Sequence, residues 1–406
     1  MRIAHFSPLP PQKSGIAAYC AELLPYLMAE AEVDVFVPDG STAVSQLPFP
    51  VHPISSFWQH APHQHPWDIC LYHMGNHPAY HDQIYTTLLR YPGIVILHDL
   101  NLHAFYLHWR ENGRFPHTAY LREMAYVGGL KALQTARQVI HGHLSPPTNQ
   151  YPLFHRITRS SLGLIVHTRH AQKQILATQP TVNIAHIPLG VRPSSLAKPA
   201  SKPPILQQVP PDAPLLLSAG YIAPSKRIEV ILQALHQLKQ EGQPFYYLLL
   251  GKPVPDYNIE AQIHDLGLAD RICLTGYVDD QTFQACLWHA DLAINLRSRP
   301  TNGEMSAALL RLMAHGKPVL VSDIDGFAEF PNGVVAKIPQ ETAEEEQQIL
   351  VQTLRDLLTQ PHKREQIGTA ARQYVATYHQ FEDVAQQYVT FARQCLQKLT
   401  KVNAYG

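Results

Sequence analysis

The stretch Leu292–Asp323, LAINLRSRPTNGEMSAALLRLMAHGKPVLVSD, decides the fold. A short apolar run that ends at Asn295 predicts a buried strand, and a second run at Pro318–Ser322 predicts another. Between them, the spacing of apolar residues in Glu304–His315 predicts a helix. A strand, a helix and a second strand in this order form a βαβ unit, whose two strands run parallel.

The same alternation of short apolar runs and longer amphipathic stretches recurs in both halves of the chain. It is typical of an α/β fold with mainly parallel sheets. We therefore expect two doubly wound, Rossmann-like domains in tandem, with a cleft between them at the carboxyl ends of the strands. The expected strands are Met1–Phe6, Val33–Val37, Ile69–Tyr72, Gly93–Leu97, Gly163–His167, Ile184–Ile187, Leu215–Ala219, Tyr246–Leu250, Arg271–Leu274, Leu292–Asn295 and Pro318–Ser322. The clearest expected helices are Ile16–Glu30, His117–His143, Arg169–Thr178, Lys226–Glu241, Asn258–Leu266, Gln281–His289 and Glu304–His315.

Prolines separate the two series of strands. Val191–Pro214 holds seven of them, a density that neither a helix nor a central strand accepts. We therefore expect a first domain at residues 1–195, a Pro-rich linker at 196–213 and a second domain at 214–380. The tail Thr342–Thr400 predicts three helices and no strand, and we expect the last helix, at 381–406, to pack back toward the first domain.

Composition excludes several classes of protein. Lys and Arg together number 32, as do Asp and Glu, so the chain lacks the basic excess of a nucleic-acid-binding protein. A 45% hydrophobic content excludes disorder. No apolar run is long enough to span a membrane, the opening MRIAHFSPLP is no secretory signal, and the five cysteines form no CxxC pair. We expect a cytoplasmic protein with reduced thiols, and leave contact with the inner face of a membrane open.

Two basic segments follow predicted strands of the second half. Lys226 and Arg227 begin a predicted helix, where two cations oppose the helix dipole unless an anion is bound. This placement favours a phosphate or pyrophosphate site over a solvated pair of cations. In the opening stretch, Arg297 and Arg299 precede Gly303. Ser306 is expected in the first helical turn, where its hydroxyl and free N–H groups can bind phosphate.

Glu304 has two explanations. Its carboxylate can accept hydrogen bonds from sugar or ribose hydroxyls. Alternatively, it is an ordinary acidic residue of a first helical turn, where the helix dipole favours it. The second explanation leaves the neighbouring arginines and Gly303 unaccounted for.

The first half offers two weaker candidates. Ser14 and Gly15 follow the first strand, where glycine lets a ligand approach the backbone and the helix that follows can bind an anion, unless Ser14 serves only as a helix cap. His98 and Asp99 follow another strand, at the edge where an α/β ligand lies, although such a pair can also be purely structural.

Histidines are concentrated in this half, but they predict no metal site. His73, His77 and His81 are spaced by four, as on one helix face. Pro78 interrupts that helix, and no cysteine or carboxylate pattern completes the set.

Several segments along nearly the whole chain match one known family. They are SGIAAY from Ser14, the pair at His98, IVHTRHA from Ile165, IPLGV from Ile187, GYIAPSKRI from Gly220, LTGYVDD from Leu274 and GEMSAALLRLMAHGKPVLVSD from Gly303. With these segments the chain resembles a family 4 glycosyltransferase with the GT-B fold. The resemblance implies transfer of a sugar from a nucleotide-diphospho-sugar to an acceptor, with retention of the anomeric configuration. It implies that the second domain binds the donor and the first the acceptor.

The family's residues carry over unevenly. Lys226 matches the lysine that neutralises the donor diphosphate, whereas Tyr221 replaces the usual arginine. The family has two glutamates in this region, and their positions are occupied here by Gly303 and Arg311. In this respect the chain resembles a branch of the family with a GETS-like block. His98 matches the histidine at the reacting centre. The implied catalytic residues are His98, Lys226 and Glu304, with donor contacts from Gly15, Lys226, Arg227, Arg297, Gly303, Glu304, Met305, Ser306 and Arg311, and acceptor contacts from Ser14, His98 and Asp99.

The expected function is that of a retaining, hexosyltransferase-like enzyme that needs no metal or other cofactor. Its acceptor would be a glycan, a lipid-linked glycan or a small molecule, and polysaccharide biosynthesis is the implied setting. Two alternatives stay open: a nucleotide-sugar epimerase or hydrolase of the same fold, and an inactive sugar-nucleotide-binding partner. The oligomeric state is left open.

Overall fold

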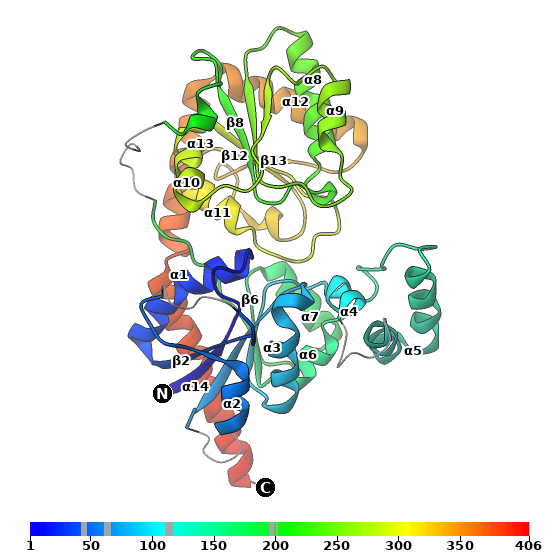
Figure 1. Cartoon of the computed structure of the whole chain (residues 1–406), viewed down its shortest axis with the longest axis vertical. Helices are drawn as coiled ribbons and strands as arrows, with labels where there is room; N and C mark the ends of the chain where they lie inside the picture. Colours follow the sequence, from blue (N-terminus) through cyan, green and yellow to red (C-terminus); the bar gives the residue numbers. More distant parts are fainter. Residues whose placement is uncertain (42–46, 61–65, 110–116, 195–198, 200–201, 406) are drawn as a thin grey trace. The chain divides into compact units, whose positions relative to one another are not determined.

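The computed structural model describes residues 1–41, 47–60, 66–109, 117–194, 199 and 202–405. The chain divides into two compact units, each built on a parallel sheet (Figure 1). Unit 1 comprises Met1–Gly190, Asn302–Met305 and Phe381–Gly406, and unit 2 comprises Val191–Thr301 and Ser306–Gln380. The predicted α/β class with two doubly wound sheets is therefore confirmed.

The sheet of unit 1 has seven strands in the order β3-β2-β1-β4-β5-β6-β7. Its central strands are buried on both faces, which is why they read as continuous apolar runs in the sequence. The order reverses once, because the chain winds outward from β1 to β3 and then returns to the other side of β1 with β4. The strands are β1 (Arg2–Phe6), β2 (Glu32–Val37), β3 (Val51–Pro53), β4 (Ile69–Met74), β5 (Ile94–Leu97), β6 (Gly163–Val166) and β7 (Ile184–His186).

Helices cover this sheet, and the terminal helix α14 packs against α1. The α14 helix is held by Phe381, which stacks on Tyr26 of α1, and by Tyr388, whose hydroxyl lies 3.3 Å from that of Tyr19. Helix α5 is kinked at Gly128–Gly129, where the backbone leaves helical geometry. The described helices are α1 (Gly15–Glu30), α2 (Ile54–His60), α3 (Pro78–Arg90), α4 (His103–His108), α5 (Thr118–Ile140), α6 (His155–Ser160), α7 (Arg169–Thr178) and α14 (Phe381–Tyr405).

The sheet of unit 2 has six strands in the order β10-β9-β8-β11-β12-β13. It also reverses once, between β8 and β11. The strands are β8 (Leu215–Ala219), β9 (Tyr246–Leu250), β10 (Ile272–Leu274), β11 (Leu292–Asn295), β12 (Val319–Ser322) and β13 (Ala336–Ile338). The α-helices are α8 (Ile228–Gln240), α9 (Ile259–Asp265), α10 (Asp280–His289), α11 (Ala307–Ala314), α12 (Ala343–Thr359) and α13 (Pro361–Tyr378), with 3-10 turns η2 (Pro204–Leu206), η3 (Pro224–Lys226) and η4 (Asp325–Glu329). Among the described residues, no helix is long and apolar enough to cross a lipid bilayer.

Two helix starts differ from the sequence prediction. The helix expected from Glu304 begins at Ala307, because Ser306 is its N-cap and accepts a hydrogen bond from the Leu309 N–H at 3.3 Å. Ser306 therefore precedes the first turn, and Glu304 lies outside the helix. The helix expected from Lys226 begins at Ile228, because Arg227 adopts a left-handed conformation that ends the η3 turn.

Two strands were not predicted. Both β3 and β13 are three-residue edge strands, too short to show a pattern, and β3 ends in a proline. The Pro-rich segment at 196–213 also differs from a bare linker, because Leu206 is fully buried and the segment groups with unit 2. Its residues 196–198 and 200–201 lie outside the described part of the chain.

The fold predicts that Phe381 anchors α14. Its ring is 1% exposed and packs so tightly on Gly190 that a Cβ there would lie 2.4 Å from it. Phe381→Ala should therefore lower the free energy of unfolding by about 3–5 kcal/mol. The control Tyr378→Ala, at a side chain 57% exposed, should change it by less than about 0.5 kcal/mol. Urea-induced unfolding measures both, and equal losses would contradict an anchoring role.

Candidate functional site

In unit 2, a lysine ammonium group lies beside the turn that follows β8. Gly220 adopts φ +91°, and a Cβ at this position would lie 2.9 Å from Nζ of Lys226. Nζ in turn donates a hydrogen bond to the carbonyl oxygen of Ala219, the last residue of β8. The glycine therefore makes room for the cation at the carboxyl end of the strand.

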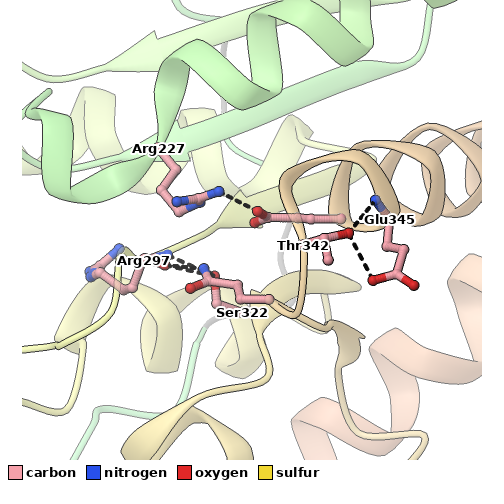
Figure 2. A network of polar contacts seen from close by, with 7 residues as sticks. Arg227, Arg297, Ser322, Thr342 and Glu345 are labelled. Atoms are coloured by element: carbon pink, nitrogen blue, oxygen red, sulfur yellow. Dashed lines mark hydrogen bonds and ion pairs between the residues drawn. The ribbon is translucent and has the colours of Figure 1, made fainter.

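Arg297 follows β11, the neighbouring strand. Its guanidinium group donates to the Asn295 Oδ1 (3.2 Å) and to the Leu296 carbonyl (2.9 Å). Its backbone N–H donates to the hydroxyl of Ser322 at 2.9 Å, and the Gln340 amide donates to the same hydroxyl (Figure 2). These contacts hold a cation, 8% exposed, in a fixed position at the end of β11.

The loops after β8 and β11 converge at the reversal of the sheet. The Ser298 N–H donates to the Ser225 carbonyl at 2.9 Å, which ties the loop of Arg297 to that of Lys226. Ser306 caps α11 and lies within 3.4 Å of the Arg297 Nη2. A helix N-terminus and two cationic side chains thus flank the point where a doubly wound sheet binds its ligand. The arrangement can hold a diphosphate.

Two other predicted donor residues are already in ion pairs. Arg227 pairs with Glu346, which is 3% exposed in the first turn of α12 (Figure 2). Burial raises the pKa of the Glu346 carboxyl, and Arg227 opposes that rise. Arg311 lies 3.5 Å from Asp280. Both arginines thus have a structural role inside unit 2, and their contact with a donor stays a prediction.

In unit 1, Ser14 and Gly15 follow β1, and the structure gives them different surroundings. The Ser14 hydroxyl accepts a hydrogen bond from the Ile16 N–H at 3.2 Å and so caps α1. Gly15 is exposed, and a Cβ there would meet no atom within 4 Å. Packing explains Ser14 but not the glycine beside it.

His98 lies among other buried histidines at the carboxyl ends of the strands. Its Nε2 lies 2.9 Å from Nδ1 of His73, the fifth residue of β4. The His167 ring, which follows β6, is 4.9 Å away, and Tyr19 of α1 packs edge-on at 5.6 Å. Burial, followed by the proximity of His167, lowers the pKa of His98 well below its usual value. His98 is therefore a neutral imidazole, which can orient a hydroxyl but carries no charge.

Asp99 and the segment Asn302–Met305 lie together in unit 1. The Leu100 N–H donates to the Asn302 carbonyl at 2.6 Å, and Gly303, at φ +75°, leaves no room for a Cβ against Leu100. The Asp99 carboxylate accepts a hydrogen bond from the Asn76 N–H at 2.9 Å. Burial and the nearby Glu304 raise the pKa of Asp99 to about 7. Glu304 and Met305 therefore group with the predicted acceptor residues of unit 1, whereas Ser306 groups with unit 2.

Sequence reasoning missed several residues of these sites. His73 and His167 lie at the ends of buried strands, as His98 does, and a search for polar residues at those positions would have found them. Tyr19 and Glu346 lie inside amphipathic helices, where no sequence pattern distinguishes them.

Known proteins are similar to this chain in the segment that holds the cationic site of unit 2. The profile of the family described as glycosyl transferases group 1 matches residues 206–374, which include Lys226, Arg297 and Ser306. Residues 206–374, which lie in unit 2, are therefore similar to this family. The alpha-D-kanosaminyltransferase of Streptomyces kanamyceticus is 24% identical over 45% of this chain and 46% of its own length. The amylovoran biosynthesis glycosyltransferase AmsK of Erwinia amylovora is 28% identical over 28% and 29%. The chain thus spans less than half the length of these curated relatives.

Solved structures match the chain along nearly its whole length. The sucrose-phosphate synthase of Thermosynechococcus elongatus superposes with a TM-score of 0.66 at 17% identity, covering 98% of this chain and 100% of its own. HepE of Anabaena, solved with UDP, gives 0.63 at 18% identity, covering 97% and 100%. At these identities the matches show the fold, which is GT-B.

The buried ion pair Arg227–Glu346 predicts a large loss of stability on neutralisation. Glu346→Gln should lower the free energy of unfolding by about 3 kcal/mol, because it leaves a partly buried guanidinium unpaired. The matched control is Glu241→Gln, which removes the more exposed partner of Arg355 and should cost less than about 1 kcal/mol. Chemical denaturation compares the two, and an equal loss would show that Glu346 does not stabilise unit 2.

Proposed function

We propose that the protein is a retaining glycosyltransferase that moves a sugar from a nucleotide-diphospho-sugar to a glycan, lipid-linked glycan or small-molecule acceptor. The observation that carries this proposal is the meeting of Lys226, Arg297 and the N-terminus of α11 at the reversal point of the unit 2 sheet. The family match covers the same residues. The names of two relatives, an amylovoran biosynthesis glycosyltransferase and a kanosaminyltransferase, support the same reaction class.

Cationic side chains of the protein would stabilise the transition state of the transfer reaction electrostatically. When the glycosidic bond breaks, negative charge develops on the departing diphosphate, and fixed donors aimed at that charge lower the barrier. The Lys226 ammonium and the Arg297 guanidinium group are held by backbone carbonyls in suitable positions. In this proposal the transfer step needs no metal ion. In unit 2, Ser306 would orient the donor, while the donor contact predicted for Glu304, which groups with unit 1, stays a prediction.

The acceptor side would rest on unit 1. A neutral His98 can orient a hydroxyl group at the anomeric centre without adding charge to it. Asp99, whose pKa is raised to about 7, can exchange a proton near neutral pH. The proposed setting is polysaccharide assembly in the cytoplasm, which the name of the amylovoran biosynthesis relative supports.

A panel of UDP-, GDP- and ADP-sugars tests the proposal. A donor at 100 times its Kd should stabilise the fold by about 2.7 kcal/mol, which a thermal-shift assay detects. Chromatography of the same mixtures follows turnover. If none of the donors shifts the melting temperature and none is consumed, the proposal fails. Turnover to a new sugar nucleotide or free sugar without any acceptor would favour the epimerase or hydrolase alternative.

Gly220→Ala should weaken donor binding at least tenfold, because the new Cβ displaces Nζ of Lys226. The control is Gly333→Ala, which has a similar φ of +84° but no atom within 4 Å of the added Cβ. Both variants carry the backbone penalty of about 1–2 kcal/mol, so only contact with the ammonium distinguishes them. Isothermal titration with the best donor measures the difference. Equal affinities in the two variants would remove Lys226 from the donor site.

His98→Ala should reduce transfer by about 10²–10⁴-fold while leaving donor affinity within twofold of the wild type. The exposed His141→Ala serves as a control that should change neither quantity. Initial rates and donor titrations of the three proteins are needed. Full turnover in His98→Ala, or in Lys226→Ala, would instead favour a differently placed catalytic centre, whereas a wild type that binds a donor without any turnover would favour an inactive binding protein.

A further inference from the structure

A second cluster of reactive side chains lies inside unit 1, next to His98. His5 of β1, Cys20 of α1 and His73 of β4 each offer one ligand atom, and these atoms lie within 4.8 Å of one another. All three side chains are completely buried. The two imidazole rings are 4.8 Å apart between centroids and tilted by 58°, so they do not stack.

Most imidazole nitrogens of this cluster lack a hydrogen-bond partner. Both ring nitrogens of His5 and Nε2 of His73 are buried without a partner among the residues that the structure describes. A buried polar atom left unsatisfied costs about 1–3 kcal/mol, and native folds contain few of them. One unsatisfied nitrogen from each of the two rings, beside a buried thiol, points to one species that all three side chains bind.

The two nitrogens of His73 have different surroundings. Nδ1 forms the 2.9 Å hydrogen bond with His98, and Nε2 is the unpartnered one. Histidines that bind a metal commonly use one nitrogen for the ion and give the other N–H to a neighbouring acceptor. His73 has this division between its two sides.

We propose that His5, Cys20 and His73 bind one thiophilic transition-metal ion, Zn²⁺ or Cu⁺, inside unit 1. Two imidazoles and a thiolate suit these ions, whereas Mg²⁺ and Ca²⁺ require oxygen ligands. The ion replaces the thiol proton, which is released to solvent, and no atom changes oxidation state. With these three protein ligands Zn²⁺ would take a water molecule in its fourth position, and Cu⁺ with one thiolate forms a neutral trigonal site.

The site requires a small closing movement. Nitrogen and sulfur ligands of a tetrahedral Zn²⁺ ion lie roughly 3.5 Å apart, so the widest pair must approach by about 1 Å. Side-chain rotation of His5 and Cys20 can supply this movement, because no hydrogen bond holds either His5 nitrogen. The ion would then join two neighbouring strands to the helix that covers them.

Metal binding would also fix the proton on the adjacent histidine pair. With the ion on Nε2, His73 must carry its proton on Nδ1 and donate it to Nε2 of His98. His98 is then left with its proton on Nδ1. This site stands on the residues of unit 1 alone and does not depend on the proposed transferase reaction. The proposal departs from the expectation of no metal, which rests on histidines that lie close together in the sequence.

Metal analysis of the purified full-length protein tests the inference. The protein is expressed in medium supplemented with Zn²⁺ or with Cu²⁺, dialysed, and analysed by inductively coupled plasma mass spectrometry. The expected content is close to one ion per chain in the wild type and under about 0.1 in Cys20→Ser and His73→Gln. Cys286→Ser, which removes another buried thiol from unit 2, should keep the metal.

A spectroscopic titration of the wild-type protein tests the same site without relying on variants that could fail to fold. Titration of the metal-free wild type with Co²⁺ should produce the thiolate-to-cobalt charge-transfer absorption of a bound cysteine, and Zn²⁺ should remove it. Competition with a Cu⁺-specific chelator decides between the two ions. A metal-free wild-type protein that gives no cobalt band overturns the inference, because an internal water molecule would then satisfy the cluster. Metal content equal in wild type and Cys20→Ser would overturn it as well.

Discussion

Both sheets of this protein are wound outward from a central strand in two directions, and the candidate sites depend on that constraint. Where the winding reverses, the loops after two adjacent parallel strands must leave on opposite sides, so that neither covers the carboxyl end of the sheet. In unit 2 this occurs between β8 and β11, and in unit 1 between β1 and β4. Side chains at these ends are held by buried strands yet are not buried by their own connecting helices.

The two reversal points are used differently. In unit 2 the strand ends carry cations, each held by backbone carbonyl groups, and the N-terminus of α11 adds its unpaired N–H groups. That environment suits an anion. In unit 1 the strand ends carry neutral, buried imidazoles beneath α1 and α14, and burial lowers their pKa values. That environment suits a metal ion or a hydroxyl group.

The sequence allowed prediction of most strands, because a parallel strand buried on both faces is an uninterrupted apolar run. Its limits are physical. The start of α11 was misplaced by three residues because the apolar spacing cannot show that Ser306 accepts the capping hydrogen bond. The ion pair of Arg227 was not predicted because its partner Glu346 lies far away in the sequence, and only folding brings them together. The cluster of His5, Cys20 and His73 escaped prediction for the same reason: its members belong to three elements joined by the sheet order, not by spacing.

The central claim is that the reversal point of unit 2 recognises a diphosphate, and calorimetry tests it most directly. The full-length protein is titrated with a nucleoside diphosphate and with the monophosphate of the same base, for each base that binds. The account predicts that the diphosphate binds at least about tenfold more tightly, a difference of about 1.4 kcal/mol, and that Lys226→Ala abolishes this preference. Equal affinity for the two nucleotides in the wild type would contradict it.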